Sequence, residues 1–175
     1  AVAVTLPPRP SVALSNEVII MLSPSAYRSL QAPLQDVLLL AARVFPGAVF
    51  WQSGRTKVNG WQLNDTALYL FHEEYRLPLV DPVIAAALAT IGEHLLPVML
   101  LLGLATRLGA LGLLTMTLVI QLLVYPSAWA THGTWAVPLL VLLLHGGGRL
   151  SLDHLIGRWL NPISTPRAPH CTQAH

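Results

Sequence analysis

Long apolar segments alternate with polar connections along this chain, and the lengths of these segments decide the fold class. The segments at about Leu34–Lys57, Pro82–Gly103 and Thr106–Tyr125 each match the ~20 residues that a helix needs to cross a bilayer. A fourth, at about Thr134–His145, is short, so its helix is expected to begin earlier, to kink at Pro138 or to thin the bilayer. The pattern predicts an all-α, integral membrane four-helix bundle.

Two shorter helices are predicted outside these spans. Asn64 can cap a helix from Asp65 to about Tyr75 in the first long connection. Ser151 can cap a C-terminal helix that runs to about Leu160. Its apolar side chains fall on one face, as in an amphipathic helix that lies on a membrane surface: Leu152, Leu155, Ile156 and Trp159.

The spans are expected to form one domain, residues 34–160, between two terminal segments. Residues 1–33 are predicted to be partly flexible, although a brief apolar run at Val18–Leu22 could instead lie on the membrane surface. Residues 161–175 form a polar tail rich in proline. Its His170, Cys171 and His175 could suggest a metal site, but in a flexible terminus such a grouping is more typically incidental.

Composition supports the membrane assignment. Hydrophobic residues make up 54% of the chain and charged residues 10%, whereas a soluble domain has about 25% charged residues. The mean hydropathy is +0.58. The net charge is only +2 and the cations are scattered, so no nucleic-acid partner is expected. A single cysteine excludes an intrachain disulfide bond.

The cations in the connections predict the orientation of the chain in the membrane. With four spans, both termini lie on one side, and that side has six arginines against three cations on the other. The six are Arg9, Arg28, Arg107, Arg149, Arg158 and Arg167, and the three are Arg55, Lys57 and Arg76. By the positive-inside rule, we expect a multi-pass protein of the bacterial inner (plasma) membrane with cytoplasmic N- and C-termini.

Ionisable residues within two of the spans indicate the candidate site. One face of the first helix carries residues that recur every three or four positions: Arg43, Gly47, Phe50, Gly54 and Lys57. Glu93 lies near the middle of the second apolar run, where a lone charge costs roughly 3 kcal/mol. We expect Glu93 to pair with Arg43 between the first two helices. The pair would either fix the helix register or form part of a functional site.

The same residues carry a resemblance to the DoxX family of small integral membrane proteins. The pattern R-x-x-x-G-x-x-F-W-x-S-G-x-x-K over Arg43–Lys57 resembles the opening signature of that family. Glu93 in an apolar run, followed by LLLGLATRLGAL over Leu100–Leu111, resembles its second helix. The segment HGGGRLSLDHLI over His145–Ile156 resembles its closing segment. The resemblance covers about residues 36–158.

The resemblance implies a membrane subunit of a redox complex, because relatives include subunits associated with thiosulfate:quinone oxidoreductase. The chain has no cysteine-rich cluster motif, no C-x-x-C-H haem site and no dinucleotide-binding glycine loop. Electron transfer would therefore need a bound quinone or haem, or another protein subunit, and whether the chain is itself an enzyme stays open. The alternatives are a non-catalytic membrane anchor or assembly subunit of a larger complex, a small transporter, and an accessory protein in metal or redox stress.

Two sets of residues are candidates for ligand binding. A quinone enters from the bilayer and needs an apolar slot with a few donors for its carbonyls. The candidate lining consists of Trp51, Gln52, Lys57, Trp61 and His132. The candidate metal ligands are His72, Glu73, Glu74 and His132. Since adjacent residues on a helix point in different directions, only some of these could bind one ion.

Overall fold

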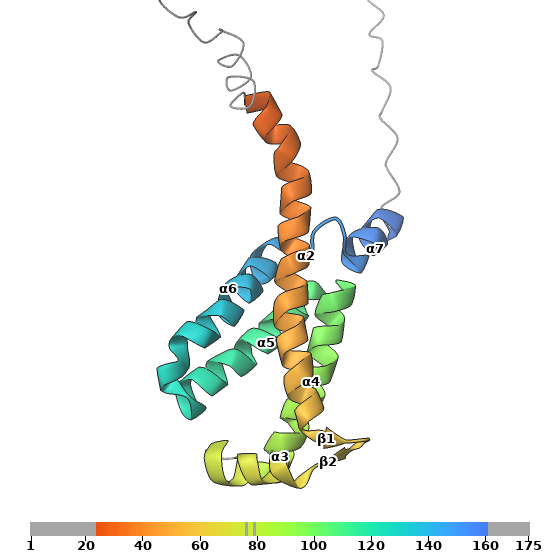
Figure 1. The fold of residues 1–175 in the computed structure, drawn as a ribbon. Coiled ribbons are helices and arrows are strands. Elements are labelled where there is room, and N and C mark those ends of the chain that lie inside the picture. Colours follow the sequence, from red (N-terminus) through yellow and green to blue (C-terminus); the bar gives the residue numbers. More distant parts are fainter. Residues whose placement is uncertain (1–23, 76, 79, 161–175) are drawn as a thin grey trace, which may run out of the picture. The chain divides into compact units, whose positions relative to one another are not determined.

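The computed structural model describes residues 24–75, 77–78 and 80–160, and helices dominate it (Figure 1). The longer helices are α2 (Pro24–Thr56), α4 (Pro82–Leu102), α5 (Thr106–Val119), α6 (Trp129–His145) and α7 (Leu152–Leu160). The shorter elements are β1 (Val58–Asn59), β2 (Gln62–Leu63), α3 (Asp65–Tyr69), the π-helices η1 (Leu70–Tyr75) and η2 (Ile120–Val124), and the 3-10 turn η3 (Pro126–Ala128). The predictions for Val18–Leu22 and for the polar tail lie outside the described residues.

Among the described residues, four helical segments are long and apolar enough to span a bilayer, which confirms the predicted fold class. They are Gln31–Thr56, Pro82–Leu102, Thr106–Val124 and Pro126–His145. The fourth begins at Pro126, well before Thr134, so its short predicted length is explained by an earlier start. Proline is compatible with the first turn of a helix because no intrahelical partner is required for its nitrogen. For the same reason α2 can begin at Pro24, earlier than the predicted Leu34.

Side-chain caps and glycines fix the ends of several helices. Asp81 caps α4, since its carboxylate accepts from the Val83 N–H at 2.9 Å. At the other end of α4, Gly103 adopts a left-handed conformation with φ of 67°. The predicted cap at Asn64 is confirmed, because its side chain accepts from the Ala67 N–H at 2.8 Å. The helix that follows continues as α3 and η1 to Tyr75, as predicted.

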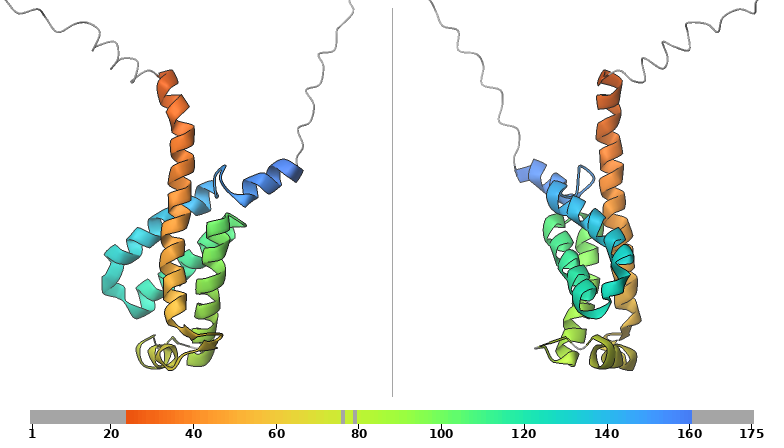
Figure 2. Two further views of the ribbon diagram at one scale, coloured as in Figure 1. Left: turned by 45° about the vertical axis from the view of Figure 1, so that its right-hand side comes forward. Right: turned by 90° about the vertical axis from the view of Figure 1, so that its left-hand side faces the viewer.

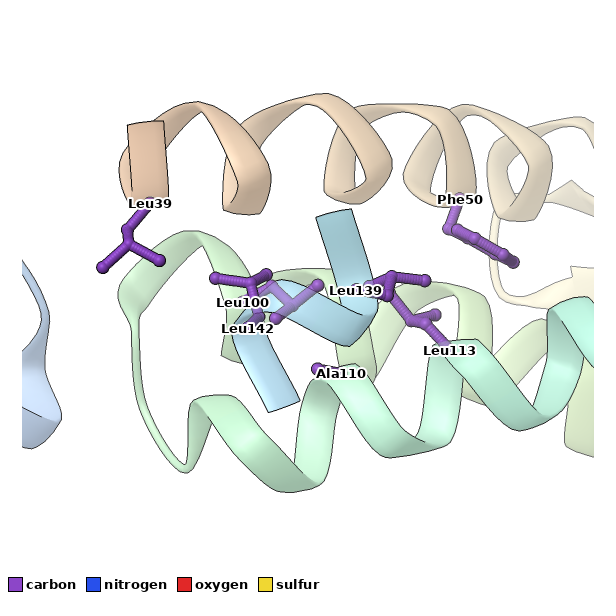
Figure 3. Close-up of a cluster of buried hydrophobic side chains, with 7 residues drawn as sticks. All are labelled: Leu39, Phe50, Leu100, Ala110, Leu113, Leu139 and Leu142. Atoms are coloured by element: carbon purple, nitrogen blue, oxygen red, sulfur yellow. The ribbon is translucent and has the colours of Figure 1, made fainter. Parts of the chain in front are cut away.

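The chain divides into two compact units, of which the second begins at Leu39 and contains the helix bundle. Within this unit α5 packs against both α4 and α6, and η1 packs against α4. Figure 2 shows α5 and α6 as neighbouring helices, with α3 and the β-hairpin at one end of α4 and α7 near its other end. The buried core joins side chains from α2, α4, α5 and α6 (Figure 3): Leu39, Phe50, Leu100, Ala110, Leu113, Leu139 and Leu142.

The predicted face of α2 is the buried face. Most residues between the members of the pattern are exposed. The members themselves are all buried: Arg43, Gly47, Phe50, Gly54 and Lys57. On the second span, Glu93, Pro97, Leu100, Leu104 and Arg107 recur at the same spacing, and the first three of them are buried in α4. Leu104 and Arg107 are exposed instead, because α4 ends at Leu102 and the chain turns.

The C-terminal helix α7 is amphipathic, as predicted. Ser151 caps it by accepting from the His154 N–H at 3.2 Å. The side chains of its apolar face are exposed, as expected for a helix whose partner is the membrane surface: Leu152, Leu155, Ile156 and Trp159.

Candidate functional site

A buried ion pair joins α4 to the residue that follows α2. The Lys57 ammonium lies 2.7 Å from one carboxylate oxygen of Glu93 and 3.0 Å from the other. It also donates to the Ser53 hydroxyl at 2.8 Å, and that hydroxyl in turn donates to Glu93 at 3.0 Å. Lys57 is 5% exposed and Glu93 is 3% exposed. Each charge thus has a close counter-charge and further hydrogen bonds, which is what burial of charges at this depth requires.

The structure corrects the predicted Arg43–Glu93 pair, because Glu93 pairs with Lys57 instead. A Cβ at Gly54 would lie 3.1 Å from the Glu93 Cβ, whereas one at Gly47 would lie 3.7 Å from the Pro97 carbonyl oxygen. This register places Arg43 near Gly103, about three helical turns from the predicted position. The cause is the connection between the helices, which contains a β-hairpin, α3 and η1 and so lets α4 begin far from the end of α2.

Arg43 is 1% exposed and contacts the closing segment of the bundle. Its Nη2 donates to the Leu150 carbonyl at 2.8 Å. Its Nε and Nη1 are buried and have no hydrogen-bond partner among the described residues. Arg43 also lies close enough to Asp153 for their charges to attract. The two ionisable residues predicted to pair therefore belong to two separate polar clusters.

Hydrogen bonds to Asp153 connect the closing segment to the turn between α4 and α5. Its carboxylate accepts from the Ala105 N–H at 2.7 Å, and from the Thr106 N–H and hydroxyl at 2.9 Å each. Burial raises the pKa of this carboxyl, but the hydrogen bonds from Thr106 and Ala105 and the charge of Arg43 outweigh burial and lower it below the ordinary value. The resulting stabilisation is present above pH ~4 and is lost as pH falls through the lower pKa of the folded state.

An apolar cavity of about 410 Å³ ends at Glu93. Elements α4, α5, η1 and η2 supply its walls, together with two residues that follow η1. Its lining consists of Phe71, Tyr75, Leu77, Val80, Ala85, Leu88, Ala89, Glu93, Thr115, Met116, Val119, Ile120 and Val124. Almost all of these side chains are apolar, so Glu93 places a charged carboxylate at the edge of a hydrophobic space. Such a combination is typical of a site for a small, largely apolar ligand.

Tyr75 is one of the few residues in this lining with a polar group on its side chain. Its ring lies 4.7 Å from that of Phe71 and 6.1 Å from that of Tyr125, measured between centroids. The Tyr125 hydroxyl donates to Glu74 at 2.8 Å. Burial, and then the charges of Tyr125, Glu93 and Glu74, raise the pKa of Tyr75 to about 12. The Tyr75 phenol therefore remains a protonated donor throughout the physiological range.

Alkaline titration is expected to detect the raised pKa of Tyr75. The folded protein should show a tyrosinate absorbance step near pH 12 that is missing in Tyr75→Phe, while Tyr69→Phe should keep it. Because the folded state holds this proton more tightly, the stability contribution is present below pH ~10 and is lost as pH rises towards 12. A Tyr75→Phe spectrum with the late step intact would contradict this assignment.

A second apolar groove, of about 470 Å³, lies between α5, η2 and α6. His132 is buried beside it, and its Nδ1 lies 2.6 Å from Oε1 of Gln121. The His132 ring also lies 5.1 Å from that of Trp135, which in turn contacts Phe50 of the core. This groove is separate from the cavity at Glu93, and the two share no lining residue.

A family model described as DoxX matches residues 38–126, about half of the chain. This chain belongs to the DoxX family. No curated protein and no solved structure matches it significantly. The matched residues include both members of the Lys57–Glu93 pair and every residue that lines the cavity at Glu93. Together with the four apolar spans, the match makes the chain a multi-pass membrane protein of the DoxX family.

The predicted quinone lining does not come together in this DoxX protein. Lys57 belongs to the ion pair, and His132 lines the separate groove. The Trp51 ring lies 5.1 Å from that of His94, while Gln52 and Trp61 are exposed. Trp51 and Gln52 directly follow buried Phe50, so the helical rotation turns them away from the buried face.

Sequence reasoning missed most of the cavity lining of this DoxX protein. Tyr75, Met116 and Ile120 come from three elements that only the folded chain brings together. A usable signal was present at Tyr75, since an aromatic residue at the end of a short interfacial helix often has a polar role. For Met116 and Ile120 no signal separated cavity residues from ordinary core residues.

The candidate metal ligands of this DoxX protein are also dispersed. His72 is exposed, and its Nδ1 lies 3.3 Å from Oε1 of neighbouring Glu73. Glu74 accepts from Tyr125, and His132 is bound to Gln121. Within residues 24–75, 77–78 and 80–160, no group of three or more His, Cys, Asp or Glu side chains is placed to hold a metal ion.

Proposed function

We propose that this DoxX protein is a membrane subunit that binds a quinone in the cavity beside Glu93 and serves quinone-linked electron transfer. The observation that carries the proposal is the cavity itself. Its volume of about 410 Å³ lies within the range of small-molecule sites, and its walls are apolar except near Glu93, Tyr75 and Thr115. A quinone has an apolar tail and two carbonyls, so it needs this combination of surfaces.

The polar groups at the cavity have roles that suit a quinone. The Tyr75 hydroxyl is a protonated donor and can hydrogen-bond to a quinone carbonyl. Glu93, which lines the cavity and is paired with Lys57, can respond electrostatically when charge develops on the ligand. Since the sequence carries no cluster motif, haem motif or dinucleotide loop, electrons would come from a partner redox protein.

The proposal includes a place for the protein in the cell. The excess of arginines on the side of the termini supports a bacterial inner membrane protein whose N- and C-termini are cytoplasmic. The cavity at Glu93 is lined in part by η1 and the residues after it, which belong to the connection that would then face the outer side of that membrane. A partner redox protein would reach the quinone most directly from that side.

Quinone retention tests the proposal. The protein is purified from its native membrane in mild detergent, and the quinone-to-protein ratio is measured by mass spectrometry. The unaltered protein is expected to retain quinone, and Ala89→Phe is expected to lower the ratio at least ~10-fold, because its ring fills the cavity. Val83→Phe is the matched control, since Val83 lies on the same helix, is exposed and is not part of the lining.

Two other results would overturn the proposal. If Ala89→Phe folds with an unchanged melting temperature and retains as much quinone as the unaltered protein, the cavity is not the quinone site. If the unaltered protein carries no quinone but a stoichiometric partner protein, it is an anchor or assembly subunit instead.

A further inference from the structure

The side-chain amide of Gln121 has a fixed orientation, and this determines the chemistry of His132. The Gln121 Nε2 donates to the Pro126 carbonyl at 2.7 Å, so the amide nitrogen faces that carbonyl. The amide oxygen therefore faces His132, at 2.6 Å from Nδ1. An amide oxygen only accepts hydrogen bonds, which means that Nδ1 of His132 carries the proton.

In a neutral His132 ring, the other nitrogen is then an acceptor. A neutral imidazole has one N–H donor and one lone-pair acceptor, and Nδ1 is already the donor. None of the described residues hydrogen-bonds to Nε2. His132 is 5% exposed and lines the groove of about 470 Å³. The groove therefore contains an oriented acceptor to which none of the described residues donates.

The remaining walls of this groove offer little else to a polar ligand. Leu114, Leu118 and Leu140 are apolar, and Trp129 lies at the exposed edge. The Thr117 hydroxyl already donates to the Leu113 carbonyl at 2.8 Å. A ligand would gain most from an apolar body that fills the groove and one hydroxyl that donates to His132. A carbonyl compound of the same shape would place its carbonyl oxygen, an acceptor, against the acceptor nitrogen of His132 and would not form this hydrogen bond.

We propose that this groove is a second ligand site, which binds a lipid-soluble hydroxyl compound and prefers a quinol to the corresponding quinone. The choice of a quinol rests on the proposed function, whereas the need for a hydroxyl donor rests on the orientation of Gln121 and His132 alone. The two sites differ in their polar groups. The cavity at Glu93 is lined by Tyr75, whose hydroxyl can donate to a carbonyl, and by a carboxylate that is already paired with Lys57, whereas the groove is lined by the His132 acceptor, which suits a hydroxyl.

Decylubiquinol and decylubiquinone are suitable probes, because they share a carbon skeleton and differ in whether they can donate. Both are titrated anaerobically into the full-length protein in nanodiscs labelled with ¹⁵N-histidine, and the His132 signals are identified by their loss in His132→Phe. We expect Nε2 to be unprotonated before addition, and decylubiquinol to shift its signal saturably. Decylubiquinone should need at least a ~10-fold higher concentration for the same shift. A protonated Nε2, or equal responses to both probes, would overturn the proposal.

Gly133 offers a variant that fills the groove without disturbing the fold. A Cβ added there meets no atom within 4 Å, and Gly133 lies inside α6, where other residues are more favourable than glycine. Gly133→Leu should therefore fold normally and weaken decylubiquinol binding at least ~10-fold. If Gly133→Leu folds and still binds decylubiquinol as tightly, the second site does not exist.

The two cavities can be tested independently. Ala89→Phe fills the cavity at Glu93 and should leave the His132 response unchanged, while Gly133→Leu should leave quinone retention unchanged. Suppose that Ala89→Phe loses quinone but that Gly133→Leu still binds decylubiquinol as the unaltered protein does. This result would refute only the second site. An intact His132 response in a protein that retains no quinone would refute only the proposed function.

Discussion

Replacing Glu93 by Leu is expected to lower the free energy of unfolding by about 3–5 kcal/mol. The reason is that Lys57, only 5% exposed, then keeps its charge in the interior and loses both carboxylate oxygens that lie within 3.0 Å. Thermal unfolding in detergent, followed by circular dichroism, should show a midpoint roughly 10 °C lower than that of the unaltered protein. A shift of only one or two degrees would mean that the pair is solvated or formed with another residue.

The double variant Lys57→Met/Glu93→Leu separates the charge effect from a packing effect. Replacing both partners of a buried ion pair by apolar side chains of similar volume is often neutral or stabilising. The double variant should therefore recover most of the stability that Glu93→Leu loses. Arg43→Met combined with Glu93→Leu is the matched control, and its effects should add, because Arg43 contacts the Leu150 carbonyl instead. Strong coupling between Arg43 and Glu93 would refute the register of the two helices.

Substituting Gly103 by Ala is expected to have the next largest effect, a loss of at least ~3 kcal/mol. With φ of 67° this residue is left-handed, which costs a residue with a Cβ about 1–2 kcal/mol. The added Cβ would also overlap Nη1 of Arg43 and lie 2.6 Å from the Ser151 Cβ, so the closing segment must move. The same thermal unfolding measurement detects this loss as a lower midpoint.

Gly60→Ala is the control for this prediction, because it has nearly the same backbone conformation but open space. Gly60 has φ of 65°, and a Cβ added there meets no atom within 4 Å. The free energy of unfolding of Gly60→Ala should fall only by the cost of the left-handed backbone conformation, about 1–2 kcal/mol. Equal losses in the two variants would show that crowding against Arg43 and Ser151 does not contribute, and that the closing segment is loosely attached.

The buried face of α2 could be predicted because it depends only on neighbouring residues. Arg43, Phe50 and Lys57 recur with the helical repeat, so any partner for this helix must cover all of them together. The four spans and the caps at Asn64 and Ser151 could be predicted for the same reason, because each depends on residues that are close together in the sequence. A span depends on the length of an apolar run, and a cap depends on a side chain and the backbone three residues further along.

The partner of Glu93 could not be predicted in this way. Arg43 and Lys57 lie on the same face of α2, and each is a plausible cation for a buried carboxylate. The choice between them depends on how far α4 is displaced along α2. That displacement is set by the elements between the helices and by close packing of Gly54 against His94, where an added Cβ would lie 2.8 Å from the imidazole.

The candidate quinone lining shows the same limit. The predicted lining has one property in common, since the expected spans and connections place all five residues towards the same side of the membrane: Trp51, Gln52, Lys57, Trp61 and His132. The side of the membrane on which a residue lies does not determine which helices pack against each other there. The cavity at Glu93 arises where α4, α5, η1 and η2 meet, and the groove at His132 arises where α5, η2 and α6 meet.

The sequence by itself determined that this is a membrane protein with four apolar helices, a buried polar face on the first of them and an amphipathic helix near the C-terminus. These features follow from composition and periodicity, which are properties of consecutive residues. Only the tertiary structure decided that Glu93 meets Lys57, that Arg43 lies against the closing segment, and that His132 lies beside Gln121 in a separate groove. The physical reason is that such contacts depend on helix register and side-chain orientation, which are set by packing between residues far apart in the chain.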